Sequence, residues 1–286
     1  MGILYMGNNE HFHLNEEIKK VKSTEQSPVR QAENTNYIYV SQDNYYIVRT
    51  SPSDDKSVLP KLYCDSATSC IIIVVTGQSK NGLHDICMIS HLSRHGRFTH
   101  FFNLVEENFY SGYNVYAAGA NPPKPYINGS KVDFTARDNA LQVSNWCITS
   151  WNVSRLNVDQ VSFRFGEGNP SVYANNLDCL SVDLVTGHIG NERISLTPED
   201  RDPTGGIQTL FCMFGNPNTI RRQDVPFTKN ETDALVRLAQ KASFQKAATM
   251  SDREILQTYS STPEFEVEWF CETIREAGKY TANYKF

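Results

Sequence analysis

The sequence predicts an α+β fold in which layers of mixed, mostly antiparallel β-sheet pack with helices and end in a C-terminal helical extension. Strand patterns dominate the middle of the chain, and helical periodicity begins after Asn230. The 286 residues, 40% of them hydrophobic, suffice for a sizeable core. We expect a flexible polar leader over 1–34, an α/β domain over 35–220 and the helical extension over 221–286.

The N-terminal part of the chain is polar and has no sustained apolar period, apart from a short helix expected at 16–22. Ordered structure is expected from Tyr37 onward. Two tyrosine-rich and β-branched runs, 37–40 and 45–49, flank the polar residues 41–44, and this pattern predicts a hairpin.

The central part of the chain predicts two buried strands. Residues 70–75 read Cys-Ile-Ile-Ile-Val-Val, a short apolar run typical of a strand that is buried on both faces. Residues 84–91 form the next strand, and the segment 78–83, which contains Asn81-Gly82, is the turn between them.

The same patterns predict the remaining elements. They are a helix over 98–109, a strand at 114–118, a helix over 138–151 that Asp138 caps, strands at 160–165, 171–173, 180–185 and 207–214, and helices over 231–250, 251–259 and 262–277.

Composition narrows the classes of function. A formal net charge of −5 with no block of Lys or Arg excludes a general nucleic-acid binder, because phosphate neutralisation needs a concentrated basic face. No apolar run approaches the roughly 18 residues of a membrane-spanning helix. The seven cysteines have no paired CxxC spacing and no secretory signal precedes them, so we expect free thiols in a reducing compartment.

The two buried strands bring a cysteine and a histidine together. A turn centred between Lys80 and Asn81 places Cys70 opposite His91, as well as Ile72 opposite Ile89 and Val74 opposite Cys87. Directly opposed residues have Cβ atoms about 4.5–5.5 Å apart, so the thiol and the imidazole would touch. Such a pair can exist as thiolate and imidazolium, and the thiolate is the competent nucleophile at neutral pH.

Two other interpretations of these residues are open. Cys70 can be a small buried hydrophobic residue and His91 a histidine satisfied at the end of a strand. Five potential ligands also crowd one region, but the HExxH glutamate is missing and Arg94 adds positive charge, so we expect no zinc site. These five residues are His84, Cys87, His91, His95 and His100.

The Cys-His hairpin resembles a known family. Thr68-Ser69-Cys70, the strand, the turn and the second strand ending in Ile-Ser-His-Leu-Ser are similar to the Cys-His core of the CheD chemotaxis deamidases. Bacterial toxins that share the CheD fold, such as cytotoxic necrotizing factor, have the same core. Weaker similarities are Ala-Ala-Gly-Ala-Asn at 117–121 and the hairpin at 182–189.

The resemblance implies a protein-glutamine deamidase without metal or organic cofactor. Its substrate would be a protein that carries a reactive glutamine, in a host if the chain is a toxin. Cys70 would attack the carboxamide, His91 would transfer protons, and the backbone N–H groups of Ser69 and Cys70 would hold the oxyanion. The third catalytic member stays open among Asp65, Ser66 and Thr68. By the same analogy the chain would be a virulence effector secreted by a bacterium into the host cytosol, or else a protein of the bacterial cytoplasm.

Two further functions fit the sequence. A thiol protease or a transglutaminase would use the same Cys-His pair and the same acyl-enzyme. A non-enzymatic module would instead grip a partner protein through apolar residues of the C-terminal helices, namely Val267, Trp269, Phe270 and Ile274.

Overall fold

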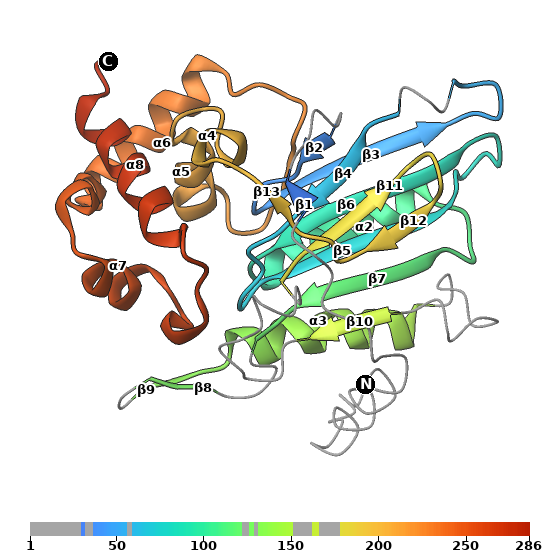
Figure 1. Cartoon of the computed structure of the whole chain (residues 1–286), viewed down its shortest axis with the longest axis horizontal. Helices are drawn as coiled ribbons and strands as arrows, with labels where there is room; N and C mark the ends of the chain where they lie inside the picture. Colours follow the sequence, from blue (N-terminus) through green and yellow to red (C-terminus); the bar gives the residue numbers. More distant parts are fainter. Residues whose placement is uncertain are drawn as a thin grey trace.

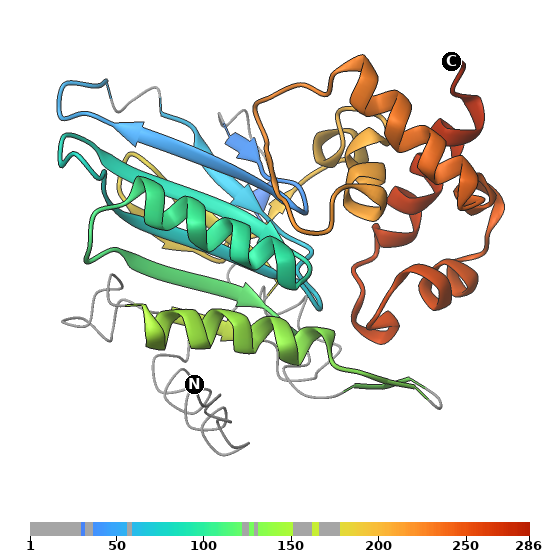
Figure 2. The same cartoon turned by 180° about the vertical axis from the view of Figure 1, so that it is seen from behind.

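The computed structural model describes residues 30–31, 37–55, 59–121, 126–128, 131–150, 162–165 and 178–286. Two helices, a six-stranded mixed sheet and a four-stranded mixed sheet form three successive layers (Figure 1). A unit of helices lies at one end of both sheets (Figures 1 and 2). The predicted α+β class with C-terminal helices is confirmed.

The six-stranded sheet contains the two buried strands that the sequence predicts. They are β5 (Ile71–Gln78) and β6 (Asp85–Leu92), which pair antiparallel at the centre of the order β10-β7-β5-β6-β3-β14. The other strands are β3 (Asn44–Thr50), β7 (Asn114–Gly119), β10 (Ser162–Phe165) and β14 (Arg221–Arg222).

The four-stranded sheet has the order β12-β11-β4-β2. Its strands are β2 (Tyr37–Tyr39), β4 (Lys61–Cys64), β11 (Leu180–Asp183) and β12 (His188–Gly190). The predicted hairpin of 37–40 with 45–49 is wrong, because β2 pairs with β4 in this sheet whereas β3 pairs with β6 in the other. The polar residues between them carry the chain from one sheet to the other, with Asp43 at a φ of 61°.

Alternate residues of β5 face different layers, which explains its continuous apolar run. Ile71, Ile73 and Val75 pack towards α2 (His95–Asn108) and α3 (Thr135–Thr149). Ile72 and Val74 pack towards the four-stranded sheet. Figure 2 shows α2 lying along the sheet and α3 beside β7. The expected Asp138 cap is wrong, since α3 begins at Thr135.

The helical unit begins at α4 (Pro198–Arg201) and α5 (Ile207–Phe214), before the boundary expected at 220. The strand predicted at 207–214 is wrong, because apolar side chains of α5 recur at helical spacing and pack on the later helices. Those helices are α6 (Lys229–Lys241), η4 (Phe244–Thr249), α7 (Asp252–Tyr259), η5 (Pro263–Phe265) and α8 (Phe270–Asn283). The helices expected over 231–250 and 262–277 are therefore each interrupted.

Two short ladders complete the described part of the chain. They are β1 (Arg30–Gln31) with β13 (Ile194–Ser195), and β8 (Tyr126–Asn128) with β9 (Lys131–Asp133). Apart from β1, the predicted leader lies outside the described residues, and so does the strand expected at 171–173. Across the described residues, every helix is too short or too polar to cross a membrane.

Candidate active site

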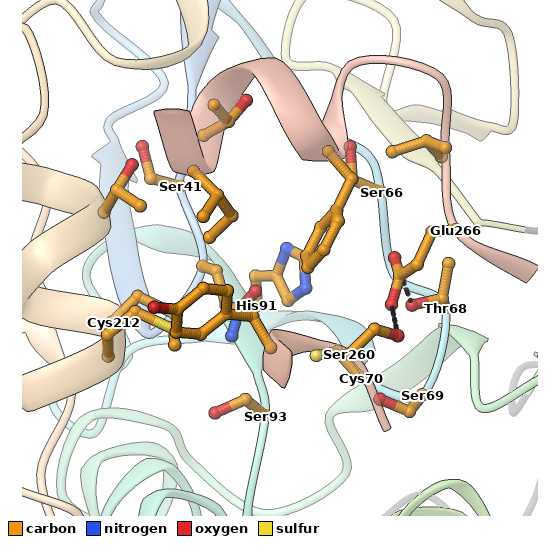
Figure 3. Close-up of a pocket in the computed structure, with 18 of the residues that line it drawn as sticks. Ser41, Ser66, Thr68, Ser69, Cys70, His91, Ser93, Cys212, Ser260 and Glu266 are labelled. Atoms are coloured by element: carbon orange, nitrogen blue, oxygen red, sulfur yellow. Dashed lines mark hydrogen bonds between the residues drawn. The ribbon is translucent and has the colours of Figure 1, made fainter. Parts of the chain in front are cut away.

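A cavity of about 490 Å³ lies where the ends of the two sheets meet the helical unit. Its walls come from distant parts of the sequence, which are the segments 39–42, 66–70, 91–94, 201–213 and 259–274, together with Thr135. Both Cys70 and His91 line this cavity, as Figure 3 shows.

The observed strand register differs from the predicted one by two residues. Ile72, and not Cys70, lies opposite His91, and Val74 lies opposite Ile89. The true centre of the turn lies one residue further along the chain, between Asn81 and Gly82, which moves every partner by two. A shift of two keeps each side chain on the same face of the sheet. Cys70, just before β5, is therefore diagonal to His91 on the same face, and both reach the cavity.

His91 is buried and neutral. Burial lowers its pKa to about 4, although the charges of Asp43 and Asp65 act in the opposite direction. Its Nδ1 lies 3.3 Å from the sulfur of Cys64 on β4, and its Nε2 has no hydrogen-bond partner among the described residues. If Nδ1 carries the proton and donates it to Cys64 Sγ, then Nε2 is left as an acceptor.

Cys70 is a buried thiol that lines the cavity. Burial is the largest cause that raises its pKa, and the carboxyl groups of Asp43 and Glu266 raise it further. A thiol with a raised pKa and an imidazole with a lowered one do not exchange a proton at rest. Both pKa shifts disfavour the expected thiolate-imidazolium pair, so we expect the ionisation of Cys70 to accompany substrate binding.

None of the three expected partners of His91 forms a hydrogen bond with it. Asp65 binds Arg201 and accepts hydrogen bonds from Tyr39 and Tyr63, at 3.1 and 3.0 Å. Ser66 donates to Asp65 at 2.9 Å, and Thr68 donates to Glu266 at 3.2 Å. Ser66 and Thr68 line the cavity, and Asp65 is fully buried. The atom in contact with the imidazole belongs instead to Cys64, which the sequence reasoning missed.

The backbone around Cys70 is held by the segment that follows β7. The N–H of Ala120 donates to the carbonyl oxygen of Cys70 at 2.7 Å, and the N–H of Asn121 donates to that of Thr68 at 2.6 Å. Gly119 has a φ of 114°, and a side chain there would collide with the Cys70 carbonyl. Within the described chain the N–H groups of Ser69 and Cys70 donate to no acceptor, so they remain the candidate oxyanion donors.

The C-terminal extension supplies one wall of the cavity and a carboxyl group that the sequence reasoning missed. Glu266 accepts hydrogen bonds from Ser260 and Thr68 (Figure 3), and burial raises its pKa to about 7. The extension is anchored by Trp269, whose ring lies 3.8 Å from the guanidinium of Arg201 and whose Nε1 donates to Ser66 at 2.8 Å. The apolar residues considered as a partner-binding surface, Val267, Trp269, Phe270 and Ile274, line the cavity instead.

The histidines near β6 do not assemble a metal centre. Nδ1 of His100 accepts a hydrogen bond from the N–H of Ile220 at 3.0 Å. Among the described residues there is no group of three His, Cys, Asp or Glu side chains that could hold a metal ion.

No protein-family model matches the chain, and no curated protein matches it either.

Proposed function

We propose that the protein is a cysteine-dependent amidohydrolase that converts a glutamine side chain of a target protein to glutamate. The observation that carries this proposal is the position of Cys70 and His91 on one face at the end of two paired strands, both open to the same cavity. The resemblance of this hairpin to the CheD deamidases supports the same reaction. A bacterial effector acting on a host protein is the setting that this resemblance suggests.

The proposed reaction begins when the substrate carboxamide enters the cavity. The Cys70 thiol gives its proton to Nε2 of His91 as the sulfur attacks the carboxamide carbon. The N–H groups of Ser69 and Cys70 stabilise the resulting oxyanion. The C–N bond then breaks as the imidazolium protonates the departing ammonia, which leaves a thioester on Cys70.

Hydrolysis of the thioester completes the cycle. His91, again neutral, takes a proton from a water molecule while the oxygen of that water attacks the thioester carbon. The C–S bond breaks, the Cys70 sulfur regains the proton from His91, and the product is glutamate. Cys64 acts as the positioning residue, because its sulfur contacts Nδ1 and orients Nε2 towards the cavity.

A thiol protease or transglutaminase is the second candidate, because both form the same acyl-enzyme from a cysteine and a histidine. The three reactions differ in the bond that breaks and in the acceptor that follows. A reaction in ¹⁸O-labelled water separates them. A deamidase places the label in a glutamate side chain, a protease places it in a new chain terminus, and a transglutaminase incorporates an amine instead.

The test is a screen of bacterial and host-cell lysates for glutamines that become glutamates, mapped by mass spectrometry in labelled water. We expect conversion at specific sites by the wild-type protein and none by Cys70→Ala or His91→Ala. Cys212→Ala is the matched control, because Cys212 also lines the cavity but has no place in the reaction. Conversion that survives in Cys70→Ala, or no labelled site in any lysate, would refute the proposal.

A further inference from the structure

The carboxyl group of Glu266 occupies an unusual position for an acidic side chain. It lines the cavity that contains Cys70, and its two hydrogen-bond partners among the described residues are the hydroxyl groups of Ser260 and Thr68. Among the described residues it forms no ion pair with Lys, Arg or His. The side chain is half-buried, and a carboxylate partly withdrawn from water without a cation is costly, so such a group calls for a functional explanation.

We infer that Glu266 is a specificity-determining residue that admits a neutral carboxamide to the cavity and excludes its carboxylate counterpart. As a neutral acid, Glu266 can donate a hydrogen bond to an amide oxygen; as a carboxylate, it can accept one from an amide nitrogen. An anionic ligand has no N–H to offer and is repelled by the carboxylate form. This inference rests on the proposed function in taking Cys70 as the reacting group.

The same repulsion assists turnover. Deamidation turns a neutral amide into an anion inside the cavity, where Glu266 and the product carboxylate repel each other more strongly than in water. Substrate is thus retained and product expelled by one side chain. Raising the pH above about 7 strengthens the discrimination, because burial places the pKa of Glu266 near that value.

Other ionisable groups of the cavity do not reproduce this pH dependence. Burial lowers the pKa of the Arg201 guanidinium, but the charge of Asp65, to which it is bound, raises this pKa above the usual value, and Arg94 lies at the exposed rim. His91 has a pKa of about 4, and burial raises the pKa of the Cys212 thiol. The remaining groups facing the cavity or Glu266 are Asp202, which accepts hydrogen bonds from Thr204 and Thr209, and Tyr39, Tyr259 and Cys271.

Two alkylating reagents test the inference without knowledge of the substrate. Iodoacetamide carries a primary amide, and iodoacetate is its carboxylate counterpart. We would measure the rate of Cys70 modification by each reagent between pH 6 and 8.5, by mass spectrometry of the full chain. The ratio of the two rates cancels the ionisation of the thiol itself, so it reports only the discrimination between amide and anion.

We expect the ratio of the iodoacetamide rate to the iodoacetate rate to rise about tenfold over this range in wild type. It should be flat in Glu266→Gln and should still rise in Glu264→Gln, a matched control whose side chain is exposed. A flat ratio in wild type, or a rise that persists in Glu266→Gln, would overturn the inference. So would a Cys70 that neither reagent modifies at any pH, since the cavity would then admit no amide.

A second measurement does not depend on alkylation. The ¹³C resonance of the Glu266 carboxyl, assigned by its loss in Glu266→Gln, should titrate near pH 7, and titration below pH 5 would contradict the inference. The proposed function is tested separately. A failed screen for substrates leaves the ratio experiment valid, whereas a working deamidase with a flat ratio refutes only the role of Glu266.

Discussion

The sulfur of Cys64 lies 3.3 Å from Nδ1 of His91, so the histidine that shares a cavity with Cys70 is held by a different cysteine. Cys64 is on the four-stranded sheet and His91 on the six-stranded sheet, and their contact crosses the core between the layers. Nε2, the nitrogen without a partner among the described residues, is the atom that would transfer protons in the proposed reaction.

The first prediction concerns this contact. Cys64→Ala removes the group at Nδ1, so we expect activity to fall about tenfold, mainly in kcat, because the imidazole is less well oriented. Cys64→Ser should restore part of the loss, since a hydroxyl can also accept from Nδ1. Cys87→Ala is the control, because Cys87 belongs to the same core without contacting the site. Equal losses in Cys64→Ala and Cys87→Ala would indicate a packing defect alone.

The second prediction concerns the resting state of Cys70. Because burial raises its pKa, alkylation in the absence of substrate should keep accelerating above the usual thiol pKa of about 8.5. His91→Ala should change this profile little, since the neutral imidazole supplies no charge. A plateau below pH 7 in wild type that disappears in His91→Ala would instead show a preformed ion pair.

The third prediction separates structure from catalysis at Asp65. This carboxylate is the partner of Arg201 and lies 3.9 Å from a guanidinium nitrogen of Arg193, all three groups being buried. Asp65→Asn leaves Arg201 without its anion, although Arg193 keeps its ion pair with Asp178, so we expect a loss of about 3–5 kcal/mol in the free energy of unfolding. Denaturant titration measures it. If Asp65→Asn keeps wild-type stability but loses activity, Asp65 is a catalytic member after all.

The fourth prediction uses the pH dependence of stability. The pKa of Glu266 is raised from 4.5 to about 7, so the folded protein favours the neutral acid. The resulting contribution of Glu266 to the free energy of unfolding is fully present below pH 4.5 and is lost as the pH rises through 7. The unfolding free energy of Glu266→Gln relative to wild type should therefore increase by up to about 3 kcal/mol between pH 4.5 and 7.5. A pH-independent difference would mean that Glu266 has an ordinary pKa.

The contribution of His91 to stability should depend on pH in the opposite direction. Its pKa falls from 6.5 to about 4 on folding, so its contribution is present above pH 6.5 and is lost as the pH falls to 4. The unfolding free energy of His91→Asn relative to wild type should thus increase on acidification, by up to about 3 kcal/mol. The two residues oppose each other in wild type, and urea titrations of both variants from pH 4 to 8 resolve them.

The fifth prediction concerns the backbone that carries Cys70. Gly119→Ala places a methyl group against the Cys70 carbonyl and 2.9 Å from Cβ of Ala67, at a φ of 114° that favours glycine. We expect a loss of about 2 kcal/mol or more in stability and a larger proportional loss of activity. Gly112→Ala is the control, since its φ is also positive but nothing lies within 4 Å. Similar activities in the two variants would contradict this role for Gly119.

Local pattern determined the central strands. Uninterrupted β-branched residues can bury both faces only as a strand between two layers, and β5 and β6 each start one residue after the predicted start. The placement of Cys70 and His91 on one face follows from the same periodicity, because an error of two in register leaves the face unchanged. The register itself depends on the turn at 79–84. The sequence pattern predicted the centre of this turn one residue too early.

Only the tertiary structure decided what surrounds these two residues. Cys64 reaches His91 by packing one sheet on the other, and Glu266 reaches Thr68 across 198 positions of sequence. Neither contact can be predicted from sequence periodicity, because each joins two single side chains that lie far apart in the sequence. A short apolar segment such as 207–214 can form either a strand or a helix, and its sequence alone does not distinguish the two. In the structure it forms the helix α5, because its apolar stripe packs on α6 and α8. Sequence thus determined that Cys70 and His91 share one face of the sheet, and packing determined their surroundings.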